Sequence, residues 1–160
     1  MRLRIDFSYD GTDFSGWAKQ PGLHTVQGTI DGALATILRL DTIQSTVAGR
    51  TDAGVHATGQ TAHIDIDESV NPEQLMRQLN SLLASEPIHV HRVVAAPPGF
   101  DARYSPMFRR YEYRVSDAVG NRDPRTRHFT LWIDDHLDID RMNEAATSIL
   151  GLHDWTTYCK

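Results

Sequence analysis

The chain has 160 residues and a mass of 18.0 kDa, with 40% hydrophobic and 23% charged residues, which is typical of one globular domain. The mean hydropathy is −0.41 and no apolar run approaches the roughly 20 residues that cross a bilayer, so the sequence excludes a membrane-spanning protein. A single cysteine, Cys159, and an N-terminus without the apolar centre of a signal peptide lead us to expect a cytoplasmic protein.

Charge gives a mixed indication about partners. Sixteen basic residues against 21 acidic ones give a net charge of −5, so bulk charge does not predict nucleic-acid binding. However, 14 of the 16 basic residues are arginines, whose planar guanidinium suits phosphate and carboxylate groups. Many of them lie between Arg103 and Arg127, so a local basic surface on an acidic protein remains an alternative.

The first half of the chain predicts three strands and one helix. Residues 2–9 alternate apolar and polar side chains, the pattern of a half-buried strand. Apolar residues from Val26 to Leu38 recur at helical spacing behind Thr25, a residue type that caps helices. Further strands are predicted at 43–47 and 61–66.

The second half predicts two helices and two strands. Asn71-Pro72 is typical of a helix start, and a second helix is predicted at about 140–150, with Gly151 as its C′ residue. Strands are predicted at 88–94 and 110–115, and 117–128 is predicted to be a loop. The order β-α-β-β-α-β-β-α indicates an α+β fold, with a mixed or mainly antiparallel sheet and helices on one face.

The segment from Ala48 to Ala57 is the strongest candidate for chemistry. Glycines bracket Arg50-Thr51-Asp52, so the backbone can approach a ligand closely. In extended chain Arg50 and Asp52 share one side, where the arginine would keep the carboxylate ionised. Such an Asp could be a nucleophile, a general base or a metal ligand, whereas the alternative is an Asp that only caps a turn.

Two other segments combine aromatic and polar residues. The loop from Gly11 to Trp17 lacks a P-loop signature, and its Phe14 and Trp17 rings either stack on a base or fill the core edge. Between Phe100 and Arg114, arginines and aromatic residues interleave, a mixture that single-stranded RNA-binding proteins use. The alternative is a strand with Tyr111 and Tyr113 in the core and its arginines in solvent.

Metal and thiol chemistry are disfavoured. His63, His89 and His91 lie on predicted strands, but no cysteine or carboxylate completes a zinc set by spacing. Cys159 has no neighbouring Lys or His to activate its thiol. We therefore expect no metal site.

Several motifs, in order along the whole chain, resemble the tRNA pseudouridine synthase A family. They are the segments 9–17, 26–28, 48–57, 100–103, 109–113 and 151–155, the last with Trp155 where the family has Phe. The resemblance implies a ferredoxin-like lobe that converts uridine to pseudouridine in the anticodon arm of tRNA, without a cofactor or metal. It also implies a homodimer.

The resemblance assigns roles to individual residues. The family's catalytic Asp corresponds to Asp52, its basic neighbour to Arg50 and its active-site Tyr to Tyr111. An ionised carboxylate could attack the sugar C1′ or the base C6, or take the C2′ proton in a glycal route. We expect RNA contacts from the remaining candidates, which are Arg103, Arg109, Arg110, Arg114, Phe14 and Trp17.

The chain is shorter than the family pattern. Members carry a second α/β lobe that closes the cleft, so residues 1–160 are expected to be the N-terminal catalytic lobe without its C-terminal counterpart. Two alternatives to an active synthase stay open. One is an RNA-binding lobe that is inactive alone, and the other is a non-enzymatic α+β domain in which Asp52 only caps a turn.

Overall fold

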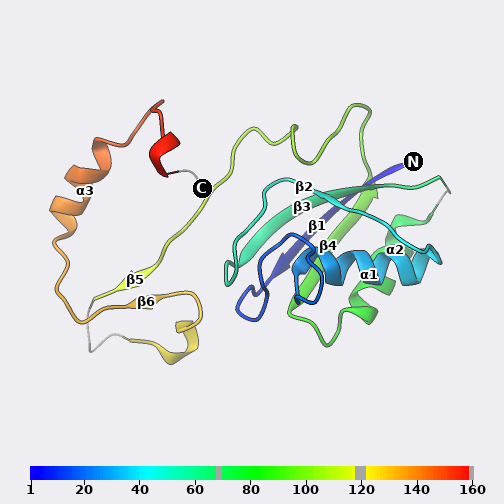
Figure 1. Ribbon diagram of the computed structural model, residues 1–160, viewed down its shortest axis with the longest axis horizontal. Coiled ribbons are helices and arrows are strands. Elements are labelled where there is room, and N and C mark those ends of the chain that lie inside the picture. Colours follow the sequence, from blue (N-terminus) through cyan, green and yellow to red (C-terminus); the bar gives the residue numbers. More distant parts are fainter. Residues whose placement is uncertain (68–69, 118–121, 159–160) are drawn as a thin grey trace. The chain divides into compact units, whose positions relative to one another are not determined.

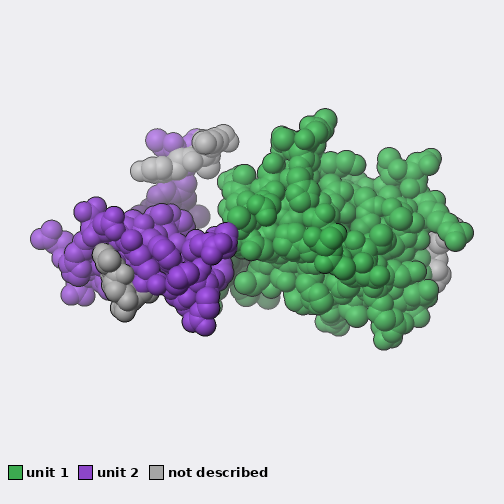
Figure 2. All heavy atoms as spheres, turned by 90° about the horizontal axis from the view of Figure 1, so that it is seen from below, with its two compact units in different colours: residues 1–111 green, residues 112–160 purple. Residues whose placement is uncertain are grey.

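The computed structural model describes residues 1–67, 70–117 and 122–158, and its chain divides into two compact units (Figure 1). Unit 1 comprises Met1–Tyr111 and unit 2 comprises Glu112–Lys160 (Figure 2). Cys159 lies outside the described residues.

A four-stranded antiparallel sheet forms the frame of unit 1. The central strand β1 (Arg2–Tyr9) pairs with β3 (Ala57–Asp65) on one side and β4 (Ile88–Ala95) on the other, and β2 (Thr46–Val47) extends β3. Helices α1 (Val26–Leu38) and α2 (Pro72–Leu82) both lie on one side of this sheet (Figure 1). The predicted α+β fold with helices on one face is confirmed.

The hydrophobic core lies between this sheet and its helices. The alternation along β1 buries Leu3, Ile5 and Phe7 completely, while the intervening polar residues stay partly exposed. The helices contribute apolar side chains at helical spacing, among them Leu34 and Leu79. Each such side chain stabilises the fold by about 1.5–3 kcal/mol, so this interface holds the sheet rigid beneath its loops.

Both predicted helix starts are confirmed. The Thr25 hydroxyl accepts the Gly28 N–H at 3.2 Å, and the Asn71 side chain accepts the N–H groups of Glu73 and Gln74. These bonds satisfy amides that have no partner within the helix.

Two strand boundaries differ from the prediction. The predicted strand 43–47 shortens to Thr46–Val47 because the Ser45 N–H turns to the Asp31 carboxylate of α1, 3.1 Å away, instead of a neighbouring strand. Burial raises the pKa of Asp31, and the Ser45 hydroxyl also donates to it. Strand β3 begins earlier than predicted, at Ala57, because it follows β1 to its end at Tyr9.

The predicted strand 110–115 is largely wrong. Only Val115–Ser116 forms a strand, β5, and it pairs in parallel with β6 (Leu131–Trp132), which the sequence analysis did not predict. Tyr111 and Tyr113 are exposed rather than part of a core. Alternation identifies a potential strand, but a strand forms only where a neighbour supplies backbone partners.

Unit 2 contains little regular structure besides this strand pair. Helix α3 (Ile139–Thr147) starts at its N-cap Asp138 and ends at Ser148, so Gly151 is not the predicted C′ residue. Two short 3₁₀ helices cover Pro124–Thr126 and Thr156–Tyr158. Among the described residues of unit 2, no hydrophobic side chain is fully buried.

Candidate active site

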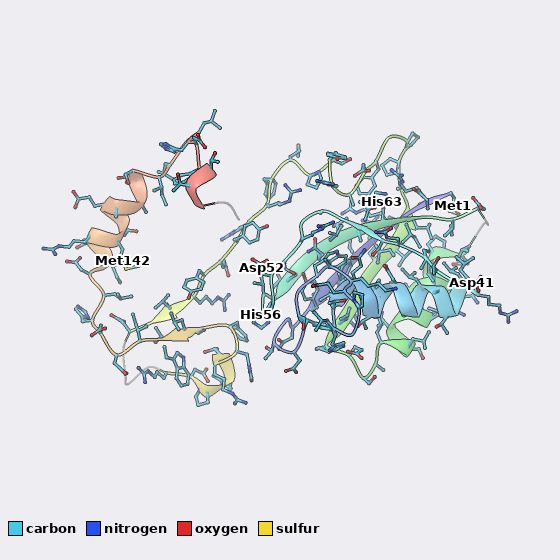
Figure 3. The ribbon with its side chains drawn as sticks, viewed as in Figure 1. Met1, Asp41, Asp52, His56, His63 and Met142 are labelled. Atoms are coloured by element: carbon cyan, nitrogen blue, oxygen red, sulfur yellow. The ribbon has the colours of Figure 1, made fainter. Side chains whose placement is uncertain are left out.

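The loop between β2 and β3 carries the candidate catalytic residues. Asp52 and His56 lie at the end of the sheet where β1 ends and β3 begins, at the opposite end from Met1 (Figure 3). The adjacent loop, residues 10–17, follows β1, so two loops that are 40 residues apart in the sequence meet here.

Asp52 opens a tight turn. The Val55 N–H donates to the Asp52 carbonyl at 3.2 Å, and Gly54 has a φ of +77°, a backbone conformation that favours glycine in such turns. The Asp52 carboxylate is exposed and makes no hydrogen bond or ion pair with any residue that the structure describes. The side chain is therefore not committed to capping the turn.

The expected pairing of Arg50 with Asp52 is not observed. Within the described ranges no ion pair joins the two side chains, and both are exposed. Sharing one side of an extended chain was the basis of that expectation, but the turn at Asp52 ends the extended segment.

The two loops are bound to each other through their backbones. The Trp17 N–H donates to the Thr51 carbonyl at 2.9 Å, and the Gly54 N–H donates to the Phe14 carbonyl at 3.3 Å. The approach is closest at Gly11, where an added Cβ would lie 2.1 Å from the Val55 carbonyl oxygen. Gly11 is thus required by the contact between the loops.

The structure contradicts the RNA-stacking role expected for Phe14 and Trp17. The two residues are only 3% and 1% exposed, so neither ring has a face open to a base. Trp17 stacks on Phe7 of β1, with ring centroids 5.8 Å apart, and Phe14 packs against His24. Both rings instead anchor the 10–17 loop in the core.

A largely buried network of polar side chains binds the Asp52 loop, and the sequence analysis missed it. The hydroxyls of Tyr9 and Thr51 lie 2.7 Å apart, and the Gln60 amide donates to the Gly49 carbonyl at 2.8 Å and to the Tyr9 hydroxyl at 3.4 Å. A polar Gln in line with the apolar positions of β3 was the only sequence signal for it.

His56 was also not assigned a role from the sequence. Its Nδ1 lies 3.0 Å from the Asp10 carboxylate and 3.2 Å from the Gly11 N–H. An unprotonated Nδ1 accepts from Gly11, whereas a protonated one donates to Asp10. In either state His56 links the Asp52 loop to the end of β1.

Arg109 and Tyr111 lie beside the start of the Asp52 loop, at Ala48 and Gly49. The Arg109 guanidinium donates to the Ala48 carbonyl, with Nε at 3.0 Å, and to the Arg103 carbonyl at 3.2 Å. A Cβ added at Gly49 would lie 3.1 Å from Arg109 Nε and 3.7 Å from the Tyr111 hydroxyl. In this structure the Arg109 guanidinium binds two backbone carbonyls.

The other arginines expected to contact RNA belong to both units. Arg103 is exposed, and its guanidinium lies 5.4 Å from the Tyr104 ring centroid, while Arg110 is also exposed. Arg114 belongs to unit 2, where it pairs with Glu112 at 3.0 Å and covers the Phe129 ring.

The segment before Arg103 is fixed to the sheet by His63. The Ala102 N–H donates to His63 Nδ1 at 3.0 Å, and Ala102 is fully buried. Burial lowers the pKa of His63, and the nearby Arg2 acts in the same direction. A neutral His63 is the form that can accept this hydrogen bond.

Groupings of side chains that could hold a metal ion were also sought. Across residues 1–67, 70–117 and 122–158, no three or more His, Cys, Asp and Glu side chains converge. No helix in these ranges has the length and apolar character needed to cross a bilayer.

Comparison with known proteins gives this arrangement a family. The sequence model described as tRNA pseudouridine synthase matches residues 7–105, which include both loops, the polar network and His63. The chain belongs to the tRNA pseudouridine synthase family. The match covers Asp52 and its supporting residues on β1 and β3, but not Arg109 or Tyr111.

Relatives of this family agree along the whole chain. Three proteins named tRNA pseudouridine synthase A come from Leifsonia xyli, Streptomyces griseus and Corynebacterium glutamicum. They are 49%, 52% and 46% identical to this chain, over 99%, 100% and 100% of its length. The chain spans 62%, 57% and 58% of their lengths.

Proposed function

We propose that this chain is the part of a tRNA pseudouridine synthase that carries the catalytic Asp52, and that the enzyme isomerises uridine in the anticodon arm of tRNA. The observation that carries the proposal is the Asp52 carboxylate, which is exposed and unpaired among the described residues on a loop held by its neighbours. Membership of the family supports the reaction class.

The chemistry calls for an ionised carboxylate. The C1′–N1 glycosidic bond must break, the uracil must turn, and a C1′–C5 bond must form as the C5 proton leaves. Asp52 supports this sequence as a nucleophile at C1′ or C6, or as the base that removes the C2′ proton. Arg50 is proposed as the basic residue that acts on the substrate beside it, since it forms no ion pair with Asp52 in the described residues.

Tyr111 is proposed to bind the target base. A uridine in a stem must leave the stack before its sugar and ring become accessible. The Tyr111 side chain is 70% exposed, and its hydroxyl lies beside Gly49, so its ring can stack on the extruded uracil near Asp52. Its hydroxyl is then available for proton transfer at C5.

The tRNA backbone is proposed to contact exposed arginines, with Arg103 and Arg110 on unit 1 as the candidates. Arg114 is a further candidate on unit 2. The homodimer and the cytoplasmic location belong to the same proposal, as does a reaction that needs neither cofactor nor metal.

Tritium release tests the proposal. The chain is incubated with tRNA that carries uridine tritiated at C5, beside its Asp52→Asn variant and an Asp41→Asn control. Asp41 is an exposed aspartate at the other end of unit 1 (Figure 3). We expect release from the wild type and the control, and a loss of at least about 10³-fold with Asp52→Asn.

The second candidate function is RNA binding without activity, which the partial coverage of the relatives' lengths favours. If the wild type releases no tritium, the same assay is repeated with the longer relative from Streptomyces griseus. Two results would then select the binding function. The relative must be active and lose that activity on the corresponding Asp→Asn change, and this chain must bind tRNA in a salt-sensitive manner. Normal release by Asp52→Asn would contradict the catalytic assignment.

A further inference from the structure

We propose that Tyr9, Thr51 and Gln60 form a positioning network that sets the direction of the Asp52 carboxylate during the reaction. This inference rests on the proposed function, because it concerns the residue proposed to be catalytic. None of the three side chains needs to touch the substrate for the network to act.

The geometry sets the direction of the Gln60 bonds, whereas either hydroxyl can donate in the Tyr9–Thr51 pair. The Gln60 side-chain oxygen accepts the Thr61 N–H at 3.3 Å, so its amide nitrogen is the donor toward Gly49 and Tyr9. Because the Tyr9 hydroxyl accepts from Gln60, its own proton is available for Thr51 Oγ1, 2.7 Å away. One buried amide therefore connects to the backbone at Gly49 and, through Tyr9, to the side chain of Thr51.

Because Tyr9 and Gln60 are buried, their hydrogen bonds restrict the conformation of the loop. Tyr9 is 4% and Gln60 is 7% exposed, so water has little access to replace a lost partner. A buried polar group that loses its partner keeps the full cost of its desolvation, so the network favours one arrangement of the loop over others.

The network acts directly before the catalytic position. Thr51 is bonded through its side chain to Tyr9 and through its carbonyl to the Trp17 N–H, at 2.9 Å. The next residue, Asp52, has no partner of its own for its carboxylate among the described residues. The position from which that side chain extends is therefore set by the backbone at Thr51 and by the turn that follows.

The matched pair Thr51→Val and Thr51→Ser separates the hydroxyl from the shape of the side chain. Valine keeps the β-branched shape but removes the bond to Tyr9, whereas serine keeps the hydroxyl. We expect Thr51→Val and Tyr9→Phe each to lower kcat for pseudouridine formation by roughly tenfold or more with KM within about twofold, since a small misplacement costs rate rather than binding. We expect Thr51→Ser to retain most of kcat.

A double variant tests whether the two hydroxyls act as one unit. Tyr9→Phe combined with Thr51→Val should lower kcat no further than the worse single variant, because both changes break the same bond. Thr36→Val serves as control, since among the described residues its hydroxyl bonds to the Gly32 carbonyl of α1 alone. Multiplicative losses in the double variant, wild-type kcat in Thr51→Val, or equal losses in Thr51→Val and Thr51→Ser would overturn the proposal.

A second measurement does not depend on activity. Amide hydrogen exchange at Trp17, whose N–H bonds to the Thr51 carbonyl, should accelerate in Tyr9→Phe and in Thr51→Val but not in Thr36→Val. If neither this chain nor a longer relative makes pseudouridine through the corresponding Asp, the proposed function fails, and unchanged exchange at Trp17 would then overturn the network as well. Accelerated exchange in an inactive chain would support the positioning role while the reaction is reassigned.

Discussion

The Arg109 guanidinium donates a hydrogen bond from Nε to the carbonyl oxygen of Ala48, 3.0 Å away. Ala48 lies four residues before Asp52 in the sequence. A second bond, from Nη2 to the Arg103 carbonyl, ties the same side chain to its own segment. Arg109 thus connects the chain that leads to Tyr111 with the loop that leads to Asp52.

Replacing Arg109 with lysine should separate the effect of these two hydrogen bonds from the effect of the positive charge. Lysine keeps the positive charge but presents one ammonium in place of the planar donor fork. We expect Arg109→Lys to bind tRNA within about twofold of the wild type and to lower kcat by roughly tenfold, as misplacement does. Filter binding and single-turnover kinetics measure the two effects.

The control for Arg109→Lys is Arg77→Lys, on α2, where the arginine pairs with Glu73 on an exposed helix surface. An unchanged kcat in Arg109→Lys, together with weakened binding in Arg109→Gln, would restore the phosphate-contact role expected from the sequence.

Tyr111→Phe should lower kcat more than it raises KM. Phenylalanine retains the ring that stacks on the extruded base but lacks the hydroxyl proposed to move the C5 proton. Tyr111→Leu should in addition raise KM, since stacking on one base contributes about 1–3 kcal/mol. Tyr113→Phe, on another exposed tyrosine, is the control. If Tyr111→Phe and the wild type have the same kcat and KM, the role of Tyr111 is stacking alone.

Gly11→Ala should destabilise unit 1 by at least about 2 kcal/mol, because the new methyl group would overlap the Val55 carbonyl at 2.1 Å and push the two loops apart. Gly32→Ala is the matched control: nothing lies within 4 Å of its added Cβ, so alanine in α1 should stabilise by about 0.5–1 kcal/mol. Urea unfolding measures both changes. Comparable unfolding midpoints for the two variants would contradict the close loop contact.

Acidification should weaken unit 1 through His63. Its pKa in the folded protein is lowered by burial, so the unfolded chain binds a proton first as the pH falls below about 6.5. The stability that neutral His63 contributes is complete above that pH and is lost as the pH falls toward the folded pKa. Urea unfolding at about pH 7.5 and pH 5.5 measures this loss.

His63→Gln is the matching variant, because glutamine retains an acceptor for the Ala102 N–H but does not titrate in this range. We expect it to show a smaller loss of stability between the two pH values than the wild type. An identical loss would mean that other groups cause the pH dependence.

Local pattern was sufficient for much of unit 1. The alternation in β1 predicted its buried face, and Thr25 and Asn71 predicted where the helices begin, because these features depend on neighbours only a few residues away. The same reasoning failed at residues 110–114, where alternation was present but the described residues supply no adjacent strand.

The aromatic and charged candidates show the same limit. The sequence around Phe14 and Trp17 is compatible both with stacking on a base and with burial in the core. The structure shows burial, because Trp17 packs against Phe7 and Phe14 packs against His24. Arg50 and Asp52 have suitable spacing for an ion pair, but none joins them among the described residues.

The sequence by itself determined the fold class, the helix starts and the loop that presents Asp52, since periodicity, capping and family motifs are all written along the chain. Only the tertiary structure decided what holds that loop. Tyr9, Gln60 and Arg109 reach it across 42, 11 and 61 residues of sequence, through the bonds to Thr51, Gly49 and Ala48. No local pattern encodes such contacts, because they exist only once the sheet has brought its strands and loops together.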